Sequence, residues 1–259
     1  MNVKNLSKNI KALIKNTLGI RSGYHTPNPI YHRLNSTFFG DGFATTHYVD
    51  FLHDSKFLEC YRDAWDFVPP PYVSERDSLN IAWRAHICTW AAVQSLGVEG
   101  DFVECGVWYG VLSKVICHYL QWQNFEDKKF YLFDTWGSMP DSHPSENYQA
   151  DTYDIVRQRF ASFPNVKLIR GVVPQSLSDI SHVKKLAFIM IDLNGHNDSK
   201  SERAALESLY PRLSRGGIIY FDDYGWGYPG LIDTIKDFLK DKPERLLHFP
   251  SGNSILVKQ

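Results

Sequence analysis

The chain has 259 residues, with 28 Lys and Arg against 29 Asp and Glu, and 43% of its residues are apolar. These values are ordinary for a globular protein and exclude a disordered, collagen-like or coiled-coil chain. The balanced charge argues against a dedicated nucleic-acid binder, and no apolar run approaches the roughly 20 residues that cross a bilayer. The length fits one large α/β domain with an added segment.

The amino-terminal residues 1–40 carry six basic side chains and no acid, which leaves a formal charge of −7 on the remainder. Apolar residues recur at helical spacing over residues 3–18. Docking of this helix on the body or on a second subunit of a homo-oligomer is the simpler interpretation, because its apolar face has no aromatic anchor. Contact with an anionic membrane surface is the alternative. We expect residues 1–73 to form a wrapping or lid-forming arm and residues 74–259 to form the main domain.

No two of the four cysteines form a C-x-x-C pair, so neither a zinc ribbon nor a redox motif is indicated. The amino terminus lacks the apolar core and cleavage site of a signal peptide. We therefore expect a cytoplasmic protein.

Strands and helices alternate after residue 74. The pattern predicts helices over residues 75–97, 111–122, 151–162, 200–213 and 230–241, and strands over residues 102–103, 130–133, 166–169, 186–191, 218–221, 245–249 and 254–257. Such alternation requires a mostly parallel sheet with helices on both faces, and the last two strands add an antiparallel hairpin. Ligands of such sheets bind beyond the carboxyl ends of the strands.

The first strand ends at Glu104 and continues through Gly106 to Gly110. Two glycines allow a sharp strand-to-helix turn and a close approach to a ligand. A turn of this kind also occurs in α/β proteins of any function, so by itself it leaves a cofactor site and a purely structural turn equally open.

The second strand ends at Asp134, and Trp136 follows. A carboxylate in this position can accept hydrogen bonds from both ribose hydroxyls, and an indole offers a flat face to an adenine. The structural alternative is a helix cap and a core tryptophan. Combined with the preceding turn, the ribose interpretation is favoured.

Acids also follow the fourth and fifth strands, Asp192 after one and Asp222-Asp223 after the other. Neighbouring parallel strands lie about 4.8 Å apart, so their carboxyl ends can converge on one ion. Oxygen ligands favour Mg²⁺, Mn²⁺ or Ca²⁺ over zinc. Capping of the following segments is the alternative, and the tandem acids favour the metal.

Several segments together resemble the macrocin O-methyltransferase family over about residues 70–240. They are DFVECGVWYG at 101–110, FDTW at 133–136, Ile191-Asp192, LYPRLSRGG at 209–217 and FDDY at 221–224. The resemblance implies a Rossmann-like class I methyltransferase fold. It also implies an enzyme that uses S-adenosylmethionine (SAM) and Mg²⁺, or Mn²⁺, to methylate a hydroxyl of a sugar or glycosylated small molecule.

The resemblance also implies roles for individual residues. Glu104 and Gly106 would face the methionine part of SAM, Asp134 the ribose and Trp136 the adenine. Gly110, Ser113 and Thr135 complete the implied cofactor-binding set, and Asp192, Asp222 and Asp223 would be the metal ligands. The chain departs from the family's Arg-Gly-Gly at Tyr109-Gly110-Val111 and from its Asp-x-Asp-Leu-Tyr at 192–196. The acceptor half therefore differs more from the family than the cofactor half.

The general base stays open between Asp192 and His196, since a histidine just past Asp192 titrates near neutral pH; a solvated loop histidine is the alternative for His196. Two other functions are also open. One is a hydroxylase-like relative that holds iron in the same carboxylates, although a 2-His-1-carboxylate set is not evident. The other is a binding protein that retains the fold without catalysis.

Overall fold

A computed structural model of the chain describes residues 36–69, 79–137, 152–193, 199–226 and 228–259. The predicted basic helix at residues 3–18, the candidate base His196 and the whole segment 138–151 lie outside these residues. Among the described residues, no helix has the combination of length and apolar character that crossing a bilayer requires.

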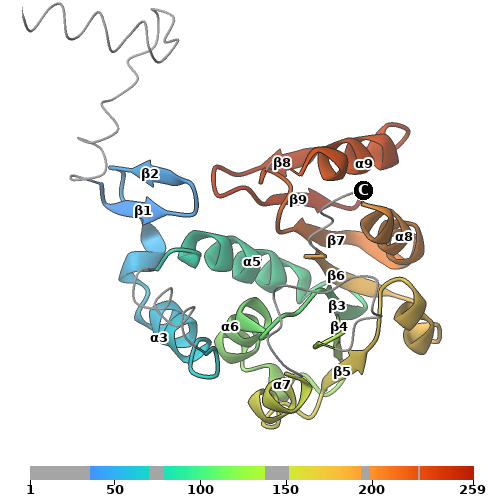
Figure 1. The fold of residues 1–259 in the computed structure, drawn as a ribbon, viewed down its shortest axis with the longest axis horizontal. Coiled ribbons are helices and arrows are strands. Elements are labelled where there is room, and N and C mark those ends of the chain that lie inside the picture. Colours follow the sequence, from blue (N-terminus) through green and yellow to red (C-terminus); the bar gives the residue numbers. More distant parts are fainter. Residues whose placement is uncertain (1–35, 70–78, 138–151, 194–198, 227) are drawn as a thin grey trace, which may run out of the picture.

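A seven-stranded sheet forms the centre of the molecule (Figure 1). Its strands are β3 (Asp101–Cys105), β4 (Phe130–Asp134), β5 (Val166–Arg170), β6 (Leu186–Ile191), β7 (Leu213–Phe221), β8 (Leu246–His248) and β9 (Ser254–Val257). The order is β5-β4-β3-β6-β7-β9-β8, with β3 to β7 parallel, β9 antiparallel to β7, and β8 antiparallel to β9. The predicted α/β class, parallel sheet and closing hairpin are confirmed.

The central strands β3 and β6 are buried on both faces, and β6 is accordingly apolar throughout, whereas β3 carries Glu104 among its buried residues. Alternate side chains point to opposite faces: Phe188 and Met190 join one core, and Ile189 and Ile191 join the other. Glu104 points to the same face as Phe102, between apolar neighbours.

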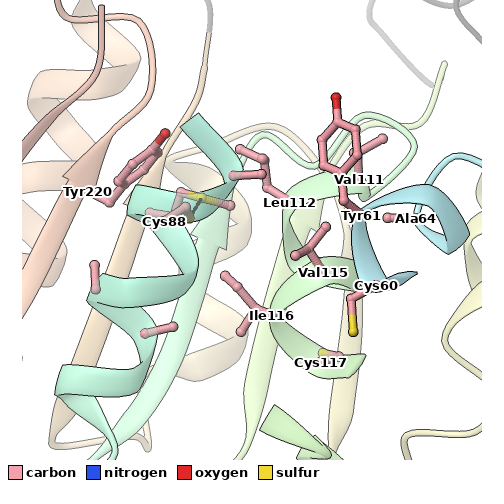
Figure 2. Close-up of a cluster of buried hydrophobic side chains, with 14 of the residues drawn as sticks. Cys60, Tyr61, Ala64, Cys88, Val111, Leu112, Val115, Ile116, Cys117 and Tyr220 are labelled. Carbon is pink, nitrogen blue, oxygen red and sulfur yellow. Dashed lines mark hydrogen bonds between the residues drawn. The ribbon is translucent and has the colours of Figure 1, made fainter. Parts of the chain in front are cut away.

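One face of the sheet is covered by α5 (Ala82–Ser95), α6 (Val111–Leu120) and α7 (Tyr153–Arg159). Figure 2 shows Val115 and Ile116 of α6 packed between α5 and the next helix outward, α3 (Ser55–Asp63). The opposite face is covered by α8 (Lys200–Leu209), α9 (Pro229–Leu239) and the 3-10 helix Gln175–Ile180.

The described part of the amino-terminal arm contains a hairpin that the sequence analysis did not predict. Strands β1 (Phe38–Gly40) and β2 (Phe43–Thr45) are joined by Asp41 and Gly42, both with positive φ (49° and 80°). Two such residues form the tight turn whose twist matches paired strands. Phe38 and Phe51 of the arm join the same core as α5 and α6, so residues 36–69 pack on the main body.

The boundary between α8 and β7 differs from the expected one. The α-helix ends at Leu209 instead of residue 213, a 3-10 turn spans Tyr210–Arg212, and β7 begins at Leu213 instead of residue 218. The α-helix gives way to this 3-10 turn because Pro211, its second residue, cannot donate the next helical hydrogen bond. The Gly216-Gly217 pair therefore lies inside the strand, where Gly216 donates to the Lys258 carbonyl over 2.8 Å.

Candidate active site

The turn between β3 and α6 is positioned by its glycines. Gly106 has a φ of 88°, and a Cβ at this residue would lie 1.8 Å from the backbone oxygen of Asp192. Only glycine therefore allows the end of β3 to pass so close to the end of β6. Gly110 (φ 72°) forms the cap that starts α6, and Phe160 lies within 3 Å of where its Cβ would be.

Asp134 organises this turn from the neighbouring strand. Its Oδ2 accepts hydrogen bonds from the backbone N–H groups of Val107 (2.7 Å) and Trp108 (2.8 Å). Its Oδ1 accepts from the N–H of Trp136 (3.0 Å), and the Thr135 hydroxyl lies 3.4 Å away. The carboxylate thus fixes the two loops that follow β3 and β4 against each other.

Trp136 is fully buried, and its indole N–H donates to the carbonyl of Trp108 over 3.0 Å. Its ring packs against Tyr153 with centroids 5.2 Å apart. The structure therefore places this indole in the core beneath the turn, as the structural alternative of the sequence analysis described.

Two further predicted cofactor residues carry buried polar atoms without a hydrogen-bond partner. They are Oε2 of Glu104 and Oγ of Ser113, in side chains that are 2% and 0% exposed. Burial, followed by the charges on Asp134 and Asp222, raises the pKa of Glu104 well above its ordinary value. Such a carboxyl group would be satisfied by a ligand that brings a positive charge or hydrogen-bond donors.

The acids that follow β6 and β7 do converge. Ligand oxygens of Asp192, Asp222 and Asp223 all lie within 4.8 Å of one another, and within the described parts of the chain this group consists of carboxylates alone. Asp223 Oδ2 is buried without a hydrogen-bond partner. A small cavity lined by Asp192, Asp223 and Glu202 opens between the ends of the two strands.

Charge repulsion within this acid cluster shows in the pKa values. Burial and the charges on Asp222 and Asp223 raise the pKa of Asp192. Burial and Asp222 raise the pKa of Asp223 to about 7. The cluster therefore holds more negative charge than its surroundings neutralise, which is the condition that a bound cation relieves.

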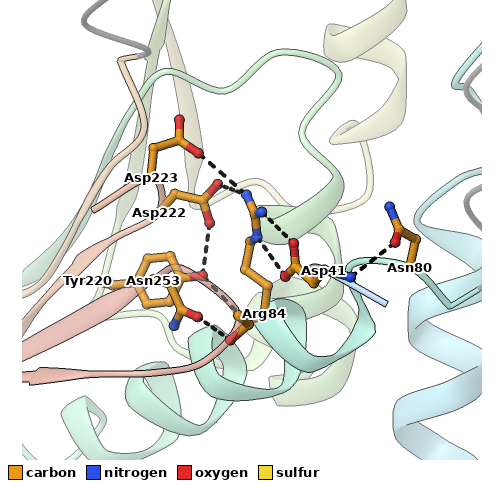
Figure 3. Close-up of polar contacts among 8 residues, drawn as sticks. Asp41, Asn80, Arg84, Tyr220, Asp222, Asp223 and Asn253 are labelled. Carbon is orange, nitrogen blue, oxygen red and sulfur yellow. Dashed lines mark hydrogen bonds and ion pairs between the residues drawn. The ribbon is translucent and has the colours of Figure 1, made fainter. Parts of the chain in front are cut away.

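A buried arginine that the sequence analysis missed lies against the acid cluster. Arg84 of α5 donates from Nη1 to Asp222 Oδ2, and the same nitrogen lies 3.6 Å from Asp223 Oδ1 (Figure 3). Its Nε and Nη2 bind both oxygens of Asp41 over 3.1 and 2.6 Å. The tip of the β1–β2 hairpin thus reaches the candidate site through this guanidinium.

Two further contacts fix this network. The Tyr220 hydroxyl donates to Asp222 Oδ1 over 2.9 Å, and the Asp41 N–H donates to Asn80 Oδ1 over 3.1 Å. The sequence does contain signals for this network. Arg84 is the one charged residue in the otherwise largely apolar α5, and Asp41-Gly42 is a typical hairpin dipeptide.

Comparison with known proteins identifies the family. A family model described as macrocin O-methyltransferase (TylF) matches residues 85–244, more than half of the chain. The chain belongs to this family. The match begins beside Arg84 and covers the turn after β3, the loop after β4 and all three acids.

A curated relative from Streptomyces olivaceus, 8-demethyl-8-(2,3-dimethoxy-alpha-L-rhamnosyl)-tetracenomycin-C 4'-O-methyltransferase, is 29% identical over 162 residues. That alignment covers 56% of this chain and 58% of the relative, so the chain matches little more than half of the relative's length.

Solved structures support the fold. The O-methyltransferase NovP superimposes with a TM-score of 0.56 at 21% identity, over 68% of this chain and 79% of its own. The methyltransferase PaMTH1 of Podospora anserina, solved with SAH bound, gives a TM-score of 0.55 at 13% identity, over 92% and 99% of the two chains. Likeness at these identities establishes the class I methyltransferase fold.

Proposed function

We propose that the protein is a SAM-dependent O-methyltransferase that uses Mg²⁺ or Mn²⁺ and acts on a hydroxyl of a sugar or glycosylated small molecule. The observation that carries this proposal is the convergence of Asp192, Asp222 and Asp223 beside the glycine turn that follows β3. Membership of the family and the sugar-methylating relative support the choice of reaction.

The donor would bind at the turn after β3. Glu104 offers a buried carboxyl group with an unpartnered oxygen, which suits the amino group or sulfonium of SAM. Asp134 holds the turn and keeps its carboxylate at the edge where a ribose would lie. When bound, SAM would supply an electrophilic methyl group for an in-line displacement, in which the S–C bond breaks and the neutral thioether of S-adenosylhomocysteine leaves.

The cation would be held by Asp192, Asp222 and Asp223. The fit rests on three features of the chain: an all-oxygen donor set, an unpartnered Asp223 oxygen and two carboxyl groups with raised pKa values. Arg84 neutralises part of this charge and leaves the remainder for the cation. When bound, a divalent ion lowers the pKa of a hydroxyl that it contacts. All-carboxylate ligands favour magnesium or manganese over the iron of a hydroxylase.

The chain's own residues would orient the acceptor and receive its proton. Asp192 follows β6, and its backbone N–H donates to the Cys105 carbonyl over 2.8 Å, so the backbone that carries this carboxylate is held against the end of β3. We assign the proton to Asp192, with His196 as the alternative base.

We also propose a cytoplasmic location. All four cysteines, Cys60, Cys88, Cys105 and Cys117, are buried and free, as suits a reducing compartment. A membrane contact or a subunit contact through residues 3–18 stays a prediction.

The test is a SAM-consumption assay with nucleotide sugars, glycans and glycosylated small molecules, run with Mg²⁺, with Mn²⁺ and with EDTA. We expect S-adenosylhomocysteine to form with at least one sugar-bearing acceptor and to be suppressed by EDTA. Failure of calorimetry to detect SAM binding, or full activity in EDTA, would contradict the proposal.

A further inference from the structure

A half-exposed tryptophan lies next to the acid cluster and has no part in the function proposed above. Trp226 follows Asp223 by three residues in the loop between β7 and α9, and its backbone N–H donates to the Asp223 carbonyl over 3.1 Å. Its side chain is 47% exposed. Single exposed aromatic side chains are common on protein surfaces, so the interest of Trp226 lies in its position beside the acid cluster and not in its exposure.

Two neighbours hold the ring of Trp226 in place. A Cβ at Gly252 would lie 2.5 Å from the indole Nε1, so the turn between β8 and β9 can rest against the ring only because residue 252 is glycine. The Gly225 N–H donates to the Gly252 carbonyl over 2.6 Å and ties the two loops together. The Arg84 guanidinium carbon lies 5.2 Å from the ring centroid, within the range of a cation–π contact.

The same arginine places the ring beside the candidate chemistry. Arg84 bonds to Asp222 and lies 3.6 Å from Asp223, so one side chain bridges the indole and the acid cluster. Burial, followed by the charge on Asp223, raises the pKa of the phenol of Tyr228, two residues further along the chain. A rigid aromatic surface is thus fixed next to the carboxylates proposed to bind the cation and the acceptor hydroxyl.

We propose that Trp226 is the stacking platform for the sugar ring of the acceptor. This inference rests on the proposed function and names the subsite for its acceptor. A pyranose presents an apolar face of C–H groups, which are attracted to the electron-rich face of an indole, while its hydroxyls project from the edge. Stacking on Trp226 would leave that edge free to face Asp223, whose Oδ2 has no hydrogen-bond partner. Binding sites of this kind combine an aromatic wall with a few polar groups that set orientation.

The test uses Trp226→Ala, Trp226→Phe and, as a matched control, Trp90→Ala. Trp90 of α5 has the same exposed fraction, 47%, but lies outside the acid cluster. Saturation-transfer NMR with Mg²⁺ present measures the binding of methyl α-L-rhamnoside, methyl α-L-fucoside and methyl β-D-glucoside to each protein. We expect the best-bound glycoside to lose about five- to tenfold in affinity in Trp226→Ala and at most about threefold in Trp226→Phe. Trp90→Ala should match the wild type.

Two results would overturn the inference: unchanged glycoside affinity in Trp226→Ala, or no binding of any of the three glycosides by the wild type. Calorimetry with SAM on the same proteins separates this inference from the proposed function. Glycoside binding that depends on Trp226 in a protein that does not bind SAM would refute the methyltransferase and keep the platform. A protein that binds SAM but whose glycoside affinity does not depend on Trp226 would keep the proposed methyltransferase and refute the platform.

Discussion

The candidate site has two halves, the turn after β3 with Asp134 and the acid cluster with Asp223, and they differ in how far the protein satisfies these carboxylates. Asp134, beside the turn after β3, accepts hydrogen bonds from three backbone N–H groups, so the chain itself satisfies it. Asp223, at the end of β7, keeps a buried oxygen without a hydrogen-bond partner and has its pKa raised to about 7. The first acid completes the fold, and the second is left for a ligand.

In the sequence, Asp134 and Asp223 look alike, because each follows a strand. In the structure they serve two different tasks: Asp134 makes a turn rigid, and Asp223 contributes to the cluster proposed to bind a cation. A saturated carboxylate gives a rigid donor-binding turn, whereas an undersatisfied cluster stores unfavourable electrostatic free energy that a cation releases on binding. Arg84 acts on the cluster alone, because it brings a partial countercharge to Asp222 and ties the cluster to the amino-terminal hairpin through Asp41.

The sharpest way to break the comparison is Asp223→Asn. We expect methyl transfer to fall about a thousandfold, about 4 kcal/mol in transition-state free energy, since the cation loses a charged ligand. SAM affinity measured by calorimetry should stay within about threefold. The control is Asp241→Asn, an exposed acid just beyond α9. Substantial activity in Asp223→Asn would show that the cluster does not serve the reaction.

Arg84→Met tests the countercharge. Asp41 and Asp222 would remain buried without their guanidinium, so we expect the free energy of unfolding in urea to fall by about 3–4 kcal/mol. Adding Asp41→Asn, or adding Mg²⁺ to the single variant, should recover part of the loss, because each reduces the uncompensated negative charge. A loss under about 1 kcal/mol would mean that the cluster is not held by this arginine.

Asp134→Asn tests the saturated half. An amide retains the shape but weakens the charge-assisted bonds to Val107, Trp108 and Trp136, so we expect a loss of about 2–3 kcal/mol in unfolding free energy and weaker SAM binding. Asp154→Asn, an exposed acid on α7, serves as the control. Unchanged stability would remove the distinction between the two acids.

The smallest predicted effect concerns a buried cation behind the turn. Lys114 of α6 donates to the Arg159 carbonyl over 2.6 Å, and burial followed by the charge on Arg159 lowers the pKa of its amine to about 8. The unfolded chain keeps a value near 10.5 and binds the proton more tightly, so stability should rise between about pH 8 and pH 10.

After allowance for partial solvent screening, that rise should amount to about 1–2 kcal/mol. The difference in urea stability between wild type and Lys114→Met, followed over this pH range, measures it. A constant difference across the range would contradict the expected ionisation.

Much of the fold was predictable because buried parallel strands have a strong local signal. Leu186–Ile191 is apolar throughout, and the strand and the acid after it were both predicted. The start of β7 was not, because Leu213–Gly217 is polar and glycine-rich and becomes a strand only through pairing with neighbouring strands. The β1–β2 hairpin is only three residues long on each side, too short for a periodic pattern.

In the site, the convergence of Asp192, Asp222 and Asp223 followed from sheet geometry alone. The approach of Asp41 and Arg84 did not, because it joins residues 43 positions apart through tertiary packing. The burial of Trp136 comes with a hydrogen bond to the Trp108 carbonyl, a tertiary contact that no spacing rule predicts. His196 lies outside the described residues, so its assignment as a base stays a prediction.

The most direct measurement of the central claim is a titration of metal-free protein with Mn²⁺, followed by electron paramagnetic resonance, for wild type, Asp223→Asn and Asp241→Asn. We expect one ion per chain in wild type and Asp241→Asn, displaced by Mg²⁺, and at least about tenfold weaker binding in Asp223→Asn. Equal Mn²⁺ affinity in all three proteins, or no binding by the wild type, would contradict a cation site at the ends of β6 and β7.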